Sequence, residues 1–208
     1  MIIDPSEHDD TSIYKLLIGS IVPRPIAFVS TISRSGVRNL APFSFFSAVC
    51  SNPPIVLIST SVRKDGKQKD THINIEATKE FVVNIVSEKF VQQMNQCSAD
   101  FTPEIDEFTV SGLTPIPADL VKPPMVGESM IQMECRLANI VTFGQGPGSG
   151  STIFGRVIRF HVADELFDNY RIDPVRLQAI GRMGGPTYTR TTDRFNMERP
   201  KLTDLRPQ

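Results

Sequence analysis

Residues 37–60 constrain the fold more than any other stretch of this sequence, because an apolar run is interrupted there by prolines. β-Branched and aromatic residues on both sides of Ser51-Asn52-Pro53-Pro54 predict two strands joined by a tight turn. Pro42 lies within the first strand, and since proline cannot donate to a β-ladder, that strand must bend or bulge. Small or polar side chains within the run would fill a core poorly but would line a slot for a flat, polar-edged ligand: Asn39, Ala41, Ser44 and Ser47.

The rest of the chain predicts strands more often than helices. The second strand of that pair is expected at 55–60, and further strands are expected at 26–32, 80–86, 130–143 and 151–163. Short helices are expected at 11–19, 71–78, 88–96 and 173–180, with Asp70 as the cap of the second. Residues 98–128 predict an irregular excursion with a short strand near Leu113, and an extended tail begins at about 190. Because most strands connect as hairpins, we expect residues 1–208 to form one domain, a mostly antiparallel β-barrel with short peripheral helices.

The composition argues against several classes of partner. Charged residues make up 22% of the 208 residues and the net charge is −1, which leaves no electrostatic footprint for nucleic acid or an anionic membrane. No stretch approaches about eighteen apolar residues, and the first residues lack a signal-peptide pattern, so a cytoplasmic location without a membrane span is expected. The three cysteines have no CxxC spacing, which favours free thiols over disulfides.

Common nucleotide and metal motifs are missing from the sequence. The glycine-rich segment 144–150 precedes a strand, whereas the dinucleotide fingerprint requires a strand, a loop and then a helix. No P-loop pattern occurs. The histidines are widely separated, and none has a metal-ligand partner at short spacing, so no metal is expected at His8, His72 or His161.

A basic loop has two interpretations. Its cations are Arg63, Lys64, Lys67 and Lys69. They can belong to an ordinary solvated loop, or they can form an anion clamp. The second interpretation follows from the neighbours of the loop, which runs from the predicted strand end Ser59-Thr60 to the predicted helix start Asp70-Thr71. A helix start offers unpaired N–H groups and a positive dipole end, so cations, hydroxyls and these N–H groups together would hold a phosphate.

Several short motifs are weak individually but specific in their order and spacing. They are Val22-Pro-Arg-Pro-Ile-Ala-Phe-Val-Ser-Thr31, Gly36, Asn39-Leu-Ala-Pro-Phe-Ser-Phe-Phe46, Pro53-Pro54, Lys69-Asp-Thr71, Asn74-Ile75, Glu80-Phe-Val-Val-Asn84, Glu134-Cys135 and Arg182-Met-Gly-Gly-Pro-Thr-Tyr188. With this arrangement, residues 12–190 resemble the flavin reductase-like family, whose members are FMN-binding split barrels of Greek-key type. The flavoredoxin-type proteins are the subgroup that the sequence resembles most.

The resemblance implies a homodimer with FMN bound near the dimer interface. Residues expected along the isoalloxazine and ribityl chain are Thr31, Asn39, Ala41, Ser44 and Phe45, with Leu40 in the same stretch. Residues expected near the ribityl chain and phosphate are Ser59, Thr60, Arg63, Lys69 and Thr71, with Asp70 between the last two. Arg182 is a further neighbour that the other subunit could contribute.

The resemblance also implies a reaction, in which NADH or NADPH passes a hydride to the flavin. The reduced flavin then delivers electrons onward, for example to a monooxygenase. Since the cofactor carries this chemistry, no residue has to act as acid or base, and we name no catalytic residue. No dedicated nicotinamide-binding motif is evident. Two alternatives remain: an FMN-binding electron carrier of flavoredoxin type reduced by a protein partner, and a barrel that binds another phosphate-bearing ligand or serves only as an interaction module.

Overall fold

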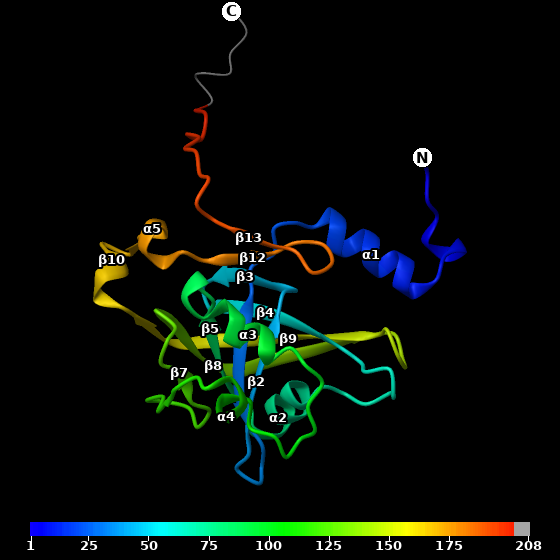
Figure 1. Ribbon diagram of the computed structural model, residues 1–208, viewed down its shortest axis with the longest axis horizontal. Helices are drawn as coiled ribbons and strands as arrows, with labels where there is room; N and C mark the ends of the chain where they lie inside the picture. The colour runs from blue at the N-terminus through cyan, green and yellow to red at the C-terminus, as the bar shows by residue number, and fades with distance from the viewer. Residues whose placement is uncertain (202–208) are drawn as a thin grey trace, which may run out of the picture.

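The computed structural model describes residues 1–201, and its centre is one seven-stranded sheet (Figure 1). The strands lie in the order β2-β1-β5-β8-β9-β4-β3. Their bounds are β1 (Ala27–Ile32), β2 (Arg38–Phe43), β3 (Phe46–Ser51), β4 (Pro54–Ser61), β5 (Glu80–Ile85), β8 (Ile131–Phe143) and β9 (Gly150–Val162). Every neighbouring pair is antiparallel, which confirms the predicted architecture.

The sheet closes on itself because its two edge strands are consecutive in the chain. β2 and β3 lie at opposite edges, and only Ser44 and Phe45 separate them. The Ser59 N–H of β4 donates to the Phe45 carbonyl at 2.9 Å, which extends the β3–β4 pairing by one residue into this link. The chain thus crosses from one edge to the other within a short link, and the sheet curls into a barrel.

The segment 37–60 therefore contains three strands, and the expectation of two was wrong. The turn between β3 and β4 is where it was predicted. Pro42, however, lies within β2, opposite Phe28 of β1. The strand ends one residue later, and Ser44 and Phe45 form the link to β3. β2 is an edge strand, so the missing N–H of Pro42 can face outward without loss of a ladder hydrogen bond. An irregularity of register between Ala48 and Cys50 bends β3 further.

β1 is buried on both faces, which explains its nearly continuous apolar sequence. One face contributes Ala27 and Val29 to the cluster inside the barrel, whose other members are Val56, Ile58, Ile75, Phe81, Val83, Met133, Cys135, Ile153 and Val157. The other face contributes Phe28 to a second cluster, which packs against α3 and α4 and includes Leu40, Phe90, Met94, Cys97 and Phe108. The helices thus cover the outer face of β1 and β2.

Short helices and small hairpins surround the barrel, as Figure 1 shows. The helices are η1 (Pro5–Glu7), α1 (Asp10–Ser20), α2 (Asp70–Thr78), η2 (Glu88–Phe90), α3 (Val91–Gln96), α4 (Glu107–Ser111), η3 (Asp164–Leu166) and α5 (Pro174–Leu177). The hairpins pair β6 (Pro115–Ile116) with β7 (Met125–Val126), β10 (Phe167–Asp168) with β11 (Arg171–Ile172), and β12 (Ile180–Arg182) with β13 (Tyr188–Arg190). Within residues 1–201, no helix is long and apolar enough to cross a membrane.

Two sequence expectations about helices were wrong. Asp70 does not cap α2, because Lys69 occupies the N-cap position and Asp70 is the first helical residue. The excursion at 98–128 is not wholly irregular, because it contains α4, which Asp106 caps by accepting the Phe108 N–H. The short strand expected near Leu113 forms a little later, as β6. Of the predicted tail, residues 191–201 form neither helix nor strand, and residues 202–208 lie outside the described part of the chain.

Candidate functional site

A cavity of about 90 Å³ lies between β2, the start of α2 and the segment after α3. It brings together six of the residues predicted from the sequence, namely Asn39, Ala41, Arg63, Lys69, Asp70 and Thr71. The segment 97–101 and Glu107 of α4 form the rest of its polar wall. A cavity of this size suits the charged end of a ligand, because sites that enclose a whole drug-sized ligand measure about 300–1,000 Å³. The remainder of a larger ligand would therefore lie outside it, along β2.

The start of α2 opens into this cavity with its backbone donors available. Lys69 is the N-cap residue, and no side chain accepts a hydrogen bond from the first turn. Asp70 and Thr71, the first helical residues, both line the cavity. The unpaired N–H groups and the helix dipole therefore favour an anion at this point.

A buried hydrogen-bond network fixes the wall behind the helix start. The Asn39 amide donates to the Thr31 hydroxyl at 3.1 Å and to the Thr71 hydroxyl at 2.9 Å. The Asn74 amide donates to the same Thr31 oxygen at 3.0 Å. Thr31 is fully buried, so it fixes the position of α2 against β2 and does not itself face the cavity. This network explains why small polar residues interrupt the apolar run of β2.

Of the four predicted cations, the two that line the cavity, Arg63 and Lys69, carry carboxylate partners in this structure. Lys69 Nζ lies 2.6 Å from Asp100 Oδ1, and an Arg63 Nη2 lies 2.6 Å from Asp70 Oδ2. Asp100 is largely exposed, so its pair with Lys69 can exchange for another anion at small cost. The Nε of Arg63 is buried and has no hydrogen-bond partner. An unpaired buried donor is unfavourable, and a bound anion would satisfy it.

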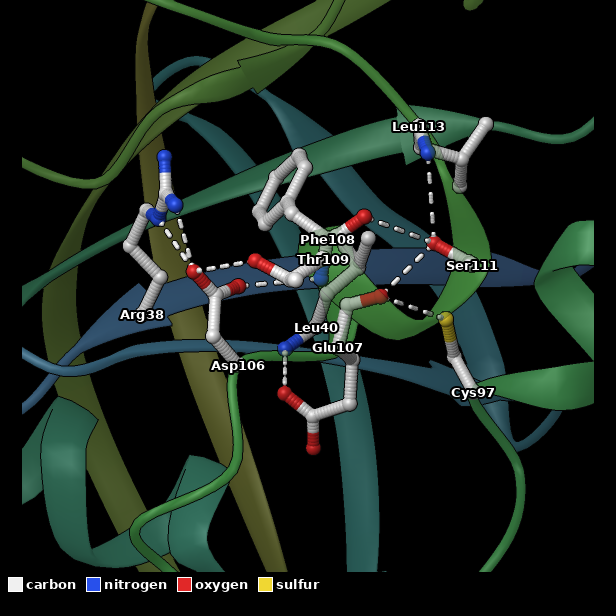
Figure 2. Close-up of polar contacts among 9 residues, drawn as sticks. All are labelled: Arg38, Leu40, Cys97, Asp106, Glu107, Phe108, Thr109, Ser111 and Leu113. Atoms are coloured by element: carbon white, nitrogen blue, oxygen red, sulfur yellow. Dashed lines mark hydrogen bonds and ion pairs between the residues drawn. The ribbon is translucent and has the colours of Figure 1, made fainter.

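Glu107 is a buried cavity residue that the sequence did not indicate. Figure 2 shows its carboxylate extending from the first turn of α4 toward β2, where one oxygen accepts the Leu40 N–H at 2.9 Å. Burial raises the pKa of this carboxyl to about 6, although the Leu40 N–H opposes the rise. The neighbouring carboxyl of Asp106 instead pairs with Arg38 at 2.5 Å.

A second group of predicted residues, Ser44 and Phe45, follows β2 and contacts Arg24. The Arg24 guanidinium donates to the Ser44 hydroxyl at 3.3 Å and lies 5.8 Å from the centre of the Phe45 ring. Arg24 also donates to the carbonyls of Ile18 and Met183, at 2.6 and 2.9 Å. It therefore joins the end of α1, the link between β2 and β3, and the loop of the β12–β13 hairpin.

The predicted residue Arg182 belongs to this second group and not to the cavity. Its backbone exchanges two hydrogen bonds with Arg24, at 2.9 and 2.8 Å. Its guanidinium stacks 4.4 Å from the centre of the Tyr188 ring and donates to the Gly185 carbonyl. Phe45, at 38% exposure, offers an aromatic surface beside this group.

The remaining predicted residues contribute less directly. The Leu40 side chain is fully buried in the core under α3 and α4, so it cannot line a slot, and its N–H is taken by Glu107. Thr60 is buried and lies 3.2 Å from His72 Nδ1, whose pKa is lowered by burial. Ser59 shares a hydrogen bond with Thr152 at 3.1 Å. These residues shape the strand behind the site.

The sequence patterns did not indicate Glu107, Asp100 or the structural role of Arg24. A capping pattern was available for the first of these, since Asp106 precedes the helix and Gly112 follows it with a φ of 69°. Arg24 stands within the Pro23-Arg24-Pro25 motif, but nothing local predicts that its partners lie at Ile18 and Met183.

Taken as chemistry, the cavity fits the phosphate of an elongated ligand. It offers an uncapped helix start, an orphaned guanidinium N–H and an exchangeable lysine. Outside it, β2 and the Ser44–Phe45 link provide an extended surface that ends at an aromatic ring and Arg24. A flavin mononucleotide has this distribution of charge and apolar surface.

Known proteins share the sequence pattern and the fold of this chain. The model of the flavin reductase like domain matches residues 18–177. The crystal structure of nitrilotriacetate monooxygenase component B from Bacillus cereus is 38% identical, with a TM-score of 0.91 over 95% of this chain and 98% of that chain. The structure of 2-nitrobenzoate 2-nitroreductase NbaA from Pseudomonas fluorescens is 33% identical, with a TM-score of 0.88 over 97% of this chain and 98% of that one.

A third structure defines the fold. A split barrel domain protein from Shewanella frigidimarina has a TM-score of 0.83 over 96% of this chain and 100% of that chain, at 19% identity. The barrel described above is therefore a split barrel, as the resemblance implied. The family model covers most of the chain, and the B. cereus and P. fluorescens proteins match nearly its full length. This chain belongs to the family of flavin reductase like domains.

Proposed function

We propose that this protein binds FMN and passes to it a hydride from NADH or NADPH. The observation that carries the proposal is the uncapped start of α2, which opens into a cavity beside Lys69 and the unpaired Nε of Arg63. Such a site favours a phosphate over a neutral group. Since riboflavin lacks the phosphate, the proposal requires a clear preference for FMN over riboflavin.

In this proposal the chain's own residues position the cofactor and tune its surroundings. The α2 N–H groups, Arg63 and Lys69 hold the phosphate, and Asn39 and Ala41 of β2 lie against the next part of the ligand. The link at Ser44 and Phe45 would support the ring end, where Arg24 adds positive charge. When bound, FMN supplies the hydride-accepting chemistry.

We also propose a homodimer. α1 exposes Tyr14, Leu16 and Leu17 at 54, 43 and 46%, although a helix usually buries its large apolar side chains. The edge strand β3 is almost wholly exposed, with Val49 at 48%. A second copy of the chain that covered these surfaces would remove apolar area from water and protect an open sheet edge.

A monooxygenase is our proposed electron acceptor, and a cytoplasmic location is proposed with it. The similarity to component B of nitrilotriacetate monooxygenase from B. cereus supports an oxygenase partner. The cysteines Cys50, Cys97 and Cys135 are all free thiols, which suits a reducing compartment.

Equilibrium titration with two flavins tests the phosphate-site part of the proposal. We expect the protein to quench FMN fluorescence at much lower concentration than riboflavin fluorescence. Equal affinity for both would remove the cavity beside α2 from the site, and binding of neither would contradict the proposed function.

A further inference from the structure

We propose that Glu107 takes up a proton when a flavin phosphate enters the cavity beside α2, so that flavin binding is coupled to proton uptake. The inference rests on the proposed function, because it concerns the phosphate end of the same site. It adds a residue that positions the β2 wall through one oxygen and responds to the charge of the ligand through the other.

The geometry gives Glu107 two different oxygens. Its Oε2 accepts the Leu40 N–H at 2.9 Å, between the cavity residues Asn39 and Ala41. Its second oxygen receives no hydrogen bond from another residue of the described part of the chain, and none is drawn to it in Figure 2. The residue is only 7% exposed, yet it lines the cavity. The free oxygen is thus available to a group inside the cavity and poorly hydrated from outside.

The side-chain charges that line the cavity oppose part of the attraction that the start of α2 exerts on an anion. The cations are Arg63 and Lys69, and the carboxylates are Asp70, Asp100 and Glu107. If all three carboxylates are ionised, the wall carries a net charge of −1. A phosphate adds about −1.5 to −2 at neutral pH, so its entry is unfavourable unless a carboxylate is protonated or moves away.

Glu107 is the carboxylate best placed to accept the proton. Asp70 is held by Arg63, and Asp100 by Lys69, and the hydrogen bond and charge of Lys69 lower the pKa of Asp100. Neither cation forms an ion pair with Glu107 within residues 1–201. Burial raises the pKa of Glu107 to about 6, and phosphate beside it would raise that pKa further.

The other groups packed against Glu107 do not provide an alternative proton acceptor. Asp106, next in the chain, is bound by Arg38 of β2 at 2.5 Å. The Cys97 thiol donates to the Glu107 carbonyl, and burial raises its pKa to about 11, so it stays neutral. Ser111 donates to the same carbonyl at 2.7 Å and does not titrate. Among the groups of the protein, proton uptake on binding is therefore assigned to Glu107. The FMN phosphate, with a second pKa of about 6, contributes equally in the wild type and in a variant without this carboxyl.

Isothermal titration calorimetry at pH 7.0 measures the coupling directly. FMN is titrated into the full-length protein in PIPES and in Tris, whose ionisation enthalpies differ, and the number of protons exchanged follows from the difference in heat. A carboxyl with a pKa of about 6 is roughly nine-tenths ionised at pH 7, so the wild type should take up close to one proton more than Glu107→Gln. Glu104→Gln, on the same segment but outside the cavity, should behave as the wild type.

Riboflavin and pH complete the design. Riboflavin should bind without this extra proton in every variant, because it brings no phosphate. In the wild type, FMN affinity should fall by up to tenfold per pH unit above pH 6 relative to Glu107→Gln. Should that variant fail to fold, the same pH series on the wild type still tests the coupling in one direction, because an equal pH dependence for FMN and riboflavin would overturn it. A difference between the two flavins includes titration of the FMN phosphate, whose second pKa is about 6.

The outcomes separate the coupling from the proposed function. FMN binding with equal proton uptake in the wild type and Glu107→Gln would overturn the coupling and leave the flavin site intact. An equal pH dependence for FMN and riboflavin would overturn it as well. Absence of any FMN binding would overturn the proposed function and this inference with it.

Discussion

Lys69 holds an exchangeable position between an exposed carboxylate and a cavity. Its pair with Asp100 is largely solvated and contributes little to folding, so the lysine is free to serve a ligand. Lys69→Ala should weaken FMN binding by about tenfold, since a charge-assisted hydrogen bond to phosphate is lost, and leave riboflavin binding unchanged. Fluorescence titration of both flavins measures this effect.

Lys64 provides the matched control for that substitution. It is exposed on the same loop and does not line the cavity. Lys64→Ala should leave the affinities for FMN and riboflavin unchanged. The free energy of unfolding of both variants should lie within about 0.5 kcal/mol of that of the wild type. Equal FMN affinity for Lys69→Ala and the wild type would exclude Lys69 from the phosphate site.

Glu107 should also leave a signature in the stability of the ligand-free protein. The folded protein keeps this proton up to about pH 6, whereas a carboxyl with the ordinary pKa of 4.5 releases it earlier. Between these values the folded state binds more protons than the unfolded state, so this group's contribution to stability falls as the pH rises. The total loss is about 2 kcal/mol and is complete above roughly pH 7.

Glu107→Gln should remove this loss, because the amide oxygen can still accept the Leu40 N–H and carries no charge. Urea unfolding at pH 4.5 and pH 7.5 gives the comparison. We expect the variant to gain about 2 kcal/mol relative to the wild type between the two pH values. A constant difference between the two proteins would contradict the raised pKa.

At the residue scale, local patterns in the sequence located several residues that the structure brings together in one cavity. Small polar residues within an apolar run predicted a site at Asn39 and Ala41, and a basic loop before a helix predicted Arg63 and Lys69; all four line one cavity. Glu107 could not be found in this way, because its contact with Leu40 joins residues 67 positions apart. Such contacts depend on tertiary packing, which local patterns do not encode.

At the scale of the element, β9 runs past the barrel core with a glycine where a side chain would collide. A Cβ on Gly155 would lie 2.2 Å from Cζ of Phe81, which is fully buried inside the barrel. Gly155→Ala should therefore destabilise the protein by about 2 kcal/mol, because Phe81 has no free space to move into. Thermal unfolding should show a fall in Tm of several degrees.

Gly19→Ala is the control for that prediction. Gly19 lies in α1, and no heavy atom comes within 4 Å of a Cβ built there. Alanine is the better helix former, so this variant should be more stable than the wild type by about 0.5–1 kcal/mol. If Gly155→Ala is as stable as the wild type, β9 and β5 pack less tightly than described.

Element types followed from the sequence where packing was simple. The long hairpin of β8 and β9 and the strands β1 and β5 were predicted within one or two residues, because β-branched runs and glycine turns mark them. The break between β2 and β3 was placed at Pro42 and occurs at Ser44 and Phe45 instead. The break is set by closure of the barrel, which no local signal specifies.

At the scale of the whole molecule, the proposed homodimer rests on the exposed apolar side chains of α1 and β3. Light scattering should give twice the 23.1 kDa of one chain. Val49→Glu places a charge in the exposed edge strand and should shift the protein toward monomer, whereas Val175→Glu on α5, at 61% exposure, should not. A monomeric wild type at micromolar concentration would contradict the proposed homodimer.

The most direct test of the central claim is an anaerobic absorbance spectrum of the protein with FMN bound, followed after addition of NADH or NADPH. We predict flavin bands shifted by binding that bleach within seconds of adding one of the two nicotinamides. Bands that persist until dithionite is added would contradict the reductase function and favour an electron carrier reduced by a protein partner. A spectrum identical to that of free FMN would contradict the flavin site itself.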